Sequence, residues 1–164
     1  MIPKWLDNYF VLKYNELPSS EKRKFKLNVC EYYSYFKKYD ELKNILKNIN
    51  SDSMEELYYN EANYYLSILN KSYSEKQNIQ NTFFSYLIKI SQNPQNDTAL
   101  ILKSKEIIAD INFDNSRVPE SLKIYDEIFY SASDNRFKSK MLYKKSSIYK
   151  LLNDRKNYVN ILGN

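Results

Sequence analysis

The chain has 164 residues and a mass of 19.7 kDa, and 43% of its residues are hydrophobic, which is enough to bury one core. It contains no histidine, one cysteine and one glycine. This composition excludes imidazole acid–base catalysis, zinc sites with histidine ligands, multi-cysteine metal sites, internal disulfides and glycine-rich phosphate loops. The 25 basic residues exceed the 20 acidic ones, and the net charge of +5 permits an acidic partner without requiring one. Because basic and acidic residues are interleaved along the chain, we expect no helix with a stripe of one sign.

No apolar run approaches the roughly 20 residues that a membrane-spanning helix needs, and the first residues lack the apolar stretch of a secretion signal. We therefore expect no membrane insertion by this segment. The compartment stays open. The cytoplasm is the default, and a periplasmic or other extracytoplasmic location applies if a signal or anchor before residue 1 has been removed.

Apolar residues recur with a helical period along the chain, and strand signals such as alternating valine and threonine or Asn-Gly turns are missing. We predict a leading helix within residues 1–18, which ends before Pro18. Helix hairpins follow it, separated by short polar breaks, and their predicted ranges are 19–50, 53–92, 97–132 and 135–162.

Residues that suit helix ends mark the boundaries of these hairpins. Ser53 and Ser74 each begin a four-residue pattern of the capping-box type, in which two side chains satisfy the free amide groups of a helix start. Asp97 suits the cap of a helix that begins at Thr98. Pro119 falls in the first turn of a helix at 118–132, where no amide hydrogen bond is lost.

A small residue followed three places later by a large or polar one occurs four times on helix-patterned segments. The pairs are Cys30 with Tyr33, Ala62 with Tyr65, Ala109 with Asn112, and Ser146 with Tyr149. A small side chain lets a neighbouring helix approach closely, so we infer one helix-hairpin unit used repeatedly, with Cys30 as an inert buried residue. The predicted fold class is all-α: an array of about four antiparallel helix hairpins after a leading helix, in a single domain over residues 1–164.

Three segments resemble the turn into the second helix of a tetratricopeptide repeat: FKKYDEL at 36–42, FDNSRVPES at 113–121 and LNDRKNY at 152–158. The resemblance covers residues 20–162 and implies a tetratricopeptide-like right-handed superhelix. The chain departs from the family's pattern because the small residue within the second helix occurs once, as Ser121, and because its intervals differ from the family's period of ~34 residues. The second hairpin has no clear match after Ser72. An unrelated helical array or bundle is the alternative.

A stack of hairpins has a concave surface lined mainly by the first helix of each pair, and this surface is the default ligand site. The residues that we expect on it are Leu27, Glu31, Tyr59, Asn63, Lys103, Glu106, Asp110, Phe113, Lys140, Tyr143, Ser147 and Lys150. This mixture predicts a polar groove with tyrosine anchors. We expect the carboxylates of Glu55, Glu56 and Glu61 to lie on a solvated face rather than in a catalytic pair.

These observations favour a protein that is not an enzyme, that needs no cofactor or metal, and that binds a peptide or another protein, whose identity the sequence does not reveal. One alternative is a structural or assembly subunit of a larger complex, such as a membrane-anchored bacterial one. It would use the final helix and the apolar cluster of Trp5, Leu6, Tyr9 and Phe10 as contact surfaces. A second alternative is nucleic-acid binding, in which lysines of residues 140–145 contact phosphates beside Tyr143, and this is the least favoured of the three.

Overall fold

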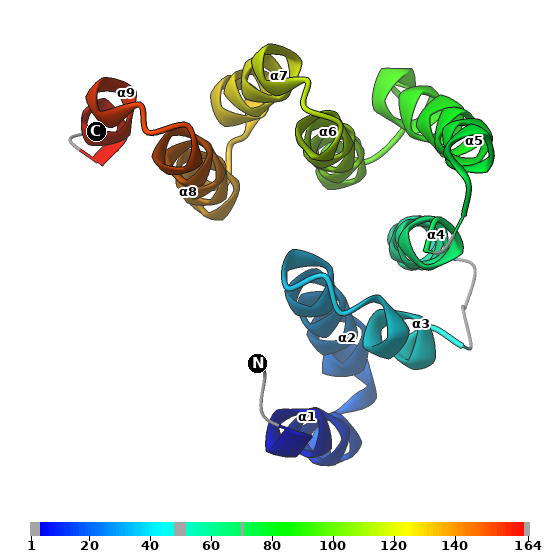
Figure 1. Ribbon diagram of the computed structural model, residues 1–164. Helices are drawn as coiled ribbons and strands as arrows, with labels where there is room; N and C mark the ends of the chain where they lie inside the picture. Colours follow the sequence, from blue (N-terminus) through cyan, green and yellow to red (C-terminus); the bar gives the residue numbers. More distant parts are fainter. Residues whose placement is uncertain (1–3, 48–51, 70, 163–164) are drawn as a thin grey trace. The chain divides into compact units, whose positions relative to one another are not determined.

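A computed structural model describes residues 4–47, 52–69 and 71–162, and this part of the chain consists of helices and turns without any strand. The all-α fold class is therefore confirmed for the residues described. The helices are α1 (Lys4–Glu16), α2 (Ser19–Tyr35), α3 (Tyr39–Ile45), α4 (Ser53–Ser67), α5 (Tyr73–Gln92), α6 (Thr98–Asp114), α7 (Val118–Ser131), α8 (Asn135–Leu151) and α9 (Arg155–Leu162) (Figure 1). The predicted hairpins 97–132 and 135–162 agree with α6–α7 and α8–α9 to within one residue at their ends. The predicted end of the first hairpin at residue 50 lies outside the described residues, and α3 ends earlier, at Ile45.

Contacts divide the chain into two compact units, Met1–Phe83 (unit 1) and Phe84–Asn164 (unit 2), with the boundary inside α5. The prediction of one domain over residues 1–164 concerns how these units join, and it stays a prediction.

Two of the predicted helix caps are displaced by one or two residues. Asp52, and not Ser53, caps α4, because its carboxylate accepts hydrogen bonds from two backbone amides at 2.9 and 3.2 Å. Ser72, and not Ser74, pairs with Glu75 at the start of α5, donating from its amide and its hydroxyl at 3.1 and 2.6 Å. In both cases several adjacent residues can cap, and the sequence does not fix which one does. Asp97 caps α6 as predicted, accepting from the amide of Ala99 at 2.7 Å.

Unit 1 has a core in which aromatic side chains join α1 to α2. Phe10 of α1 lies edge-on to Phe25, Tyr32 and Tyr33 of α2, with ring centroids 5.5 to 6.3 Å apart. The buried core residues are Val29, Cys30, Tyr33, Leu42, Leu46, Tyr58 and Ala62, from α2, the α3 segment and α4. Burial of Cys30 agrees with the prediction for this residue. Fully buried small residues on both α2 and α4 allow these helices to pack closely.

Unit 2 packs its consecutive helices α6, α7, α8 and α9 against one another. Its core consists of Leu102, Ala109, Tyr125, Ile128, Ala132, Met141 and Ile148, from α6, α7 and α8. Ala109 is fully buried, which places this predicted small residue where two helices approach each other.

Three turns, one in unit 1 and two in unit 2, have the same backbone geometry. Lys37, Ser116 and Asn153 are the described residues other than glycine with positive φ, at 55°, 61° and 57°. In each turn this residue's amide bonds the carbonyl three residues back, and the next amide bonds the carbonyl five residues back, which is the Schellman motif. The acceptors of the second bond are Tyr33, Asn112 and Tyr149.

The sequence register of these turns is also the same. The positive-φ residue lies seven positions after the small residues Cys30, Ala109 and Ser146, and two positions before α3, α7 and α9 begin. Ala62 has no such successor among the described residues, because α4 ends at Ser67 and the amide of Ile68 bonds Tyr64 within a helical cap. Three of the four predicted pairs therefore share one turn, and the second hairpin differs.

Candidate functional site

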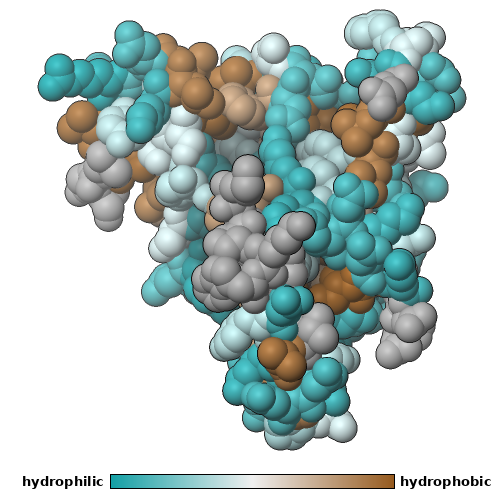
Figure 2. All heavy atoms as spheres, turned by 60° about the horizontal axis from the view of Figure 1, so that its bottom comes forward, coloured by the Kyte–Doolittle hydropathy of each residue, from teal (hydrophilic) through white to brown (hydrophobic). Residues whose placement is uncertain are grey.

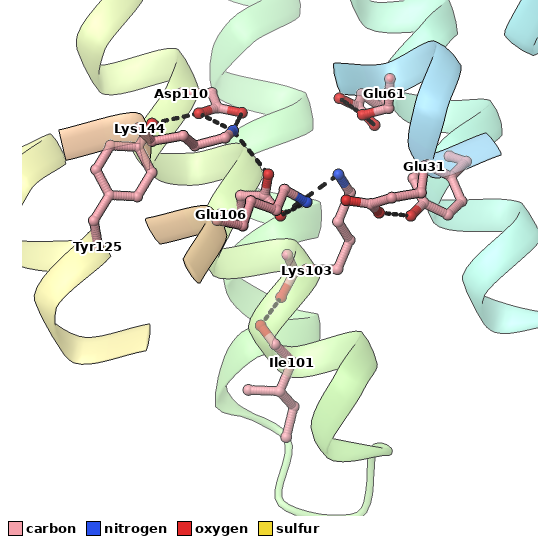
Figure 3. A network of polar contacts seen from close by, with 12 residues as sticks. Glu31, Glu61, Ile101, Lys103, Glu106, Asp110, Tyr125 and Lys144 are labelled. Carbon is pink, nitrogen blue, oxygen red and sulfur yellow. Dashed lines mark hydrogen bonds and ion pairs between the residues drawn. The ribbon is translucent and has the colours of Figure 1, made fainter. Parts of the chain in front are cut away.

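Ion pairs join α6 and α8 on two successive turns of each helix. Lys140 donates to Glu106 at 2.7 Å. Lys144 donates to Asp110 at 2.6 Å and also lies 2.7 Å from Glu106 (Figure 3). Residues 106 and 140, and residues 110 and 144, are each 34 positions apart. Because the partners advance along both helices in the same direction, α6 and α8 run parallel.

Glu106 lies at the centre of this group, which we call the α6–α8 cluster and define as Lys103, Glu106, Asp110, Tyr125, Lys140 and Lys144. The Glu106 side chain is 1% exposed and has a lysine nitrogen of α8 on each of its two oxygens. Lys103 is a third neighbour at 3.7 Å. A buried carboxylate is costly unless charged donors surround it, so the three lysines make the burial of Glu106 tolerable.

The electrostatics distinguish Lys140 from Lys144, the two α8 lysines of the cluster. Burial and the positive charge of Lys144 lower the pKa of Lys140 well below its ordinary value. Burial alone would also lower the pKa of Lys144, but the carboxylates of Asp110 and Glu106 outweigh it and raise that pKa. Lys144 is therefore the cation that the cluster holds most firmly.

Tyr125 of α7 completes the cluster by donating its hydroxyl to Asp110. Burial and the charge of Asp110 raise the pKa of Tyr125 above its ordinary value, so the phenol remains a donor. The carboxylate of Asp110 thus fixes side chains from α7 and α8 at one point of α6.

Unit 1 joins α2 and α4 by a corresponding set of contacts. Lys26 donates to Glu55 at 2.8 Å, Tyr58 donates to Glu31, and Ser34 donates to both oxygens of Glu61 at 2.8 and 2.9 Å. The partners again advance in the same direction along both helices, so α2 and α4 run parallel.

Two of the unit 1 carboxylates are buried. The expectation that Glu55, Glu56 and Glu61 share a solvated face is wrong for Glu55 and Glu61, which α2 covers, and holds for Glu56, which is exposed. The close packing of α2 against α4 explains the difference, because it brings hydroxyl and ammonium donors of α2 onto these two carboxylates.

The structure distributes the twelve predicted groove residues between both units and between different environments. Leu27, Glu31, Tyr59 and Asn63 are half-buried in unit 1, where Leu27 and Tyr59 pack on the core. In unit 2, Lys103 and Glu106 are buried, Asp110, Phe113, Lys140 and Ser147 are half-buried, and Tyr143 and Lys150 are exposed. The α8 lysines that pair with Glu106 cover it, so Glu106 and the buried Lys103 offer no surface to a partner. A binding role for the remaining residues stays a prediction.

One part of the predicted set forms a continuous accessible side of α8. Tyr143, Ser147 and Lys150 follow one another at spacings of four and three, so they lie on one side of the helix. Tyr143 is 59% exposed. An exposed tyrosine presents a flat apolar ring and a hydroxyl, which suits a contact with another protein.

The basic residues are not evenly distributed, so the expectation that no helix has one sign of charge is wrong. Helix α8 carries no acidic residue, and its basic residues are Arg136, Lys138, Lys140, Lys144, Lys145 and Lys150. Residues 135–162 contain eight basic residues and one acid, a net charge of +7, whereas the rest of the chain contains 17 basic and 19 acidic residues, a net charge of −2. Counting charges helix by helix in the sequence would have detected this asymmetry.

Much of the α8 charge is used within unit 2. Lys140 and Lys144 pair with α6, Lys145 pairs with Asp126 of α7, and Arg136 pairs with Asp134. Acids of the preceding hairpin therefore pair with three of the six basic residues of α8, and Asp134 pairs with a fourth.

Within the described ranges, no group of three or more potential ligand side chains could hold a metal ion. None of the helices described there is both long and apolar enough to cross a bilayer. Comparison with known protein families, with curated proteins and with solved structures finds no match to this chain.

Proposed function

We propose that this chain is a non-catalytic module that binds a peptide or another protein through the accessible side of its hairpin first helices. The observation that carries the proposal is the exposed side of α8, with Tyr143, Ser147 and Lys150, next to a cluster that fixes α8 on α6. Binding surfaces need rigid supports, and the ion pairs to Glu106 and Asp110 supply one.

The helical-repeat character of the module is part of the proposal. It is supported by the three identical turns, by the parallel orientation of first helices within each unit, and by the 37-residue interval between the equivalent turn residues Ser116 and Asn153. This interval is close to the period of about 34 residues of tetratricopeptide repeats but does not equal it. First helices of such repeats line the surface that binds ligands.

The test uses two exposed tyrosines of unit 2 that lie on different helices. Tyr143 belongs to α8, whereas Tyr130, 80% exposed, belongs to α7, the second helix of its hairpin. We expect Tyr143→Ala to lose most of the protein recovered by affinity capture from the native lysate, and Tyr130→Ala to retain it. Circular dichroism establishes that both variants fold. Equal recovery by the two variants would contradict the assignment of the groove.

A second candidate function, an assembly subunit, is favoured by the outer side of α1. Phe10 packs on α2, but Tyr9 and Leu12 are exposed on the same short helix. Exposed apolar residues near each other can mark a contact with another subunit. The side chains of Trp5 and Leu6, which the sequence prediction also used, lie outside the described ones. Replacement of Tyr9 and Leu12 by serine keeps Phe10 in place, and light scattering of this variant at several concentrations would show reduced association if α1 is a subunit contact and no change if it is not.

Nucleic-acid binding receives less support. Lys140, Lys144 and Lys145 each contact a carboxylate of α6 or α7, so phosphates would have to replace these ion pairs. We expect fluorescence anisotropy at low salt to show no micromolar binding of single-stranded RNA or DNA.

A further inference from the structure

The turn between α8 and α9 presents apolar and basic side chains within a few residues of each other. Leu151, Leu152 and Val159 are 73%, 53% and 55% exposed. Arg155 and Lys156 are also exposed, and they lie four and three positions before Val159, so one side of α9 presents all three. Figure 2 shows that exposed hydrophobic residues of this protein form patches among hydrophilic ones on the face drawn there.

The two basic residues of this turn differ from those that face α6 and α7. Neither Arg155 nor Lys156 has an ion pair with an acid of the described chain, whereas Lys140, Lys144 and Lys145 each have one. The one acid nearby, Asp154, accepts hydrogen bonds from the backbone and side chain of Asn157 at 3.1 and 2.8 Å and so begins α9. The charge of Lys156 also lowers the pKa of Asp154, but less than these two hydrogen bonds do. Because Lys156 is exposed, its interaction with Asp154 is weak.

Helix α6 of unit 2 is an example of a partner surface that suits basic and apolar side chains of this hairpin. The lysines of α8 meet a helix that carries Glu106 and Asp110 four positions apart, and this helix buries apolar residues such as Leu102 and Ala109 beside its acids. The surface at the end of unit 2 has the same combination of charges and aliphatic side chains, but without the acidic helix.

We propose that Leu151, Leu152, Arg155, Lys156 and Val159 form an end surface that binds an amphipathic helix of a partner protein, with aliphatic residues along its centre and glutamate or aspartate on its flanks. This inference rests on the proposed protein-binding function, and it assigns the chemistry of the partner at a set of residues other than Tyr143 and Ser147. Arg155 and Lys156 are basic residues of 135–162 that no carboxylate of the described chain pairs, in contrast to Arg136, Lys140, Lys144 and Lys145, and their charges favour an acidic partner.

The composition of the end surface favours a protein helix over a lipid surface or RNA. Anionic membranes are recognised by clusters of about four to eight basic residues, and Arg155 and Lys156 are two. Single-stranded RNA needs aromatic side chains for stacking, and the exposed large apolar residues of this turn are aliphatic. Aliphatic side chains flanked by two cations suit a helix laid across them.

The experiment uses two fluorescent synthetic helices with the same leucine seam, one flanked by glutamates and the other by lysines. We expect the glutamate-flanked peptide to bind the full chain by fluorescence anisotropy, with an affinity that falls as salt rises. The double variant Arg155→Glu/Lys156→Glu should bind it at least about tenfold more weakly and should bind the lysine-flanked peptide more tightly than the wild type does. Weaker binding of one peptide together with tighter binding of the other follows from charge exchange and not from unfolding, which would expose apolar side chains to both peptides alike.

Further variants test whether the apolar side chains of the end surface contribute to binding and whether this surface acts independently of Tyr143. Leu152→Ser/Val159→Ser should weaken binding of the glutamate-flanked peptide, whereas Tyr143→Ala should leave it unchanged. Equal affinity of the two peptides for the wild type, no binding of either, or tighter binding to phosphatidylserine vesicles than to the glutamate-flanked peptide would overturn the proposal. The proposal that Tyr143 binds the native partner is tested separately. It fails if Tyr143→Ala recovers as much of the native partner in the capture experiment as the wild type does.

Discussion

The two units bring parallel first helices together in chemically different ways. In unit 1, Cα atoms of α2 and α4 come within 8 Å of each other, and hydroxyls of Ser34 and Tyr58 reach carboxylates directly. In unit 2, no Cα atom of α6 lies within 8 Å of one in α8, and the long side chains of Lys140 and Lys144 span the distance. The parallel arrangement in unit 1 thus combines close packing with the ion pairs of Lys26 with Glu55 and of Arg23 with Asp52, whereas long charged side chains span the wider separation of α6 and α8.

This difference predicts which kind of substitution should destabilise each unit most. Replacing a charge should damage unit 2 most, because Glu106 serves several lysines in a buried position. Adding volume should damage unit 1 at least as much as unit 2, because Cys30 and Ala62 are fully buried between closely packed helices.

Removal of the Glu106 charge should have the largest effect. Glu106→Gln keeps the shape of the side chain but leaves Lys103, Lys140 and Lys144 without their shared counter-charge, and we expect the free energy of unfolding to fall by about 3–5 kcal/mol. Urea denaturation measures this change. In unit 1, Ser34→Ala removes a neutral donor from Glu61 and should cost about 1–3 kcal/mol. A larger loss for Ser34→Ala than for Glu106→Gln would reverse the comparison.

Overpacking of the small buried residues should come next. Ala62→Leu and Ala109→Leu should each lower the free energy of unfolding by about 1–3 kcal/mol, because both side chains are fully buried. Gln95→Leu, at an exposed position between α5 and α6, is the control and should change stability by less than about 0.5 kcal/mol. Thermal melts that show the alanine variants as stable as the control would place these residues outside the helix contacts.

The repeated turns predict a stabilising substitution. Ser116 adopts positive φ, which costs a non-glycine residue roughly 1 kcal/mol, so Ser116→Gly should raise the free energy of unfolding by up to about that amount. Asn153→Gly should raise it less, because asparagine tolerates this conformation better than serine. Loss of stability in both variants would show that the turns do not hold this conformation in solution.

The smallest expected effect is the loss of stability at low pH that results from protonation of Asp52. Hydrogen bonds from Arg23 and from the amides of Glu55 and Met54 hold the pKa of Asp52 below its ordinary value of 3.8, even though burial opposes them. Because the folded-state pKa is the lower one, the stabilisation from this cap is present above pH 3.8 and is lost as the pH falls through the folded-state value. Unfolding titrations of wild type and Asp52→Asn should therefore converge at low pH, and a constant difference between them would argue against the cap.

Local patterns in the sequence predicted much of the helical layout. The hairpins of unit 2 follow from apolar periodicity, from Asp97 as a cap and from Pro119 in a first turn. The small residues Cys30, Ala109 and Ser146 were found by their spacing, and each precedes a turn of the same geometry by seven positions. These features depend on residues close together in the chain, which explains why the sequence shows them.

Features that depend on neighbouring helices were not predicted. Nothing local distinguishes buried Glu55 and Glu61 from exposed Glu56, because their donors Lys26 and Ser34 come from α2. Likewise, the predicted groove residue Glu106 is buried beneath lysines that α8 brings from further along the chain, with Lys140 lying 34 positions after it. The side of α8 with Tyr143 was predicted from helical spacing and is accessible, although its role in binding stays a prediction.

The most direct test of the comparison is a double-mutant cycle on Asp110 and Lys144, the pair that joins α6 to α8 at the 34-residue step. The variants Asp110→Asn, Lys144→Met and their combination would be unfolded in urea at low and high salt. We predict a coupling free energy of about 1–3 kcal/mol that high salt reduces only in part, because both side chains are partly buried. A coupling near zero would contradict the conclusion that charge holds these two parallel helices together.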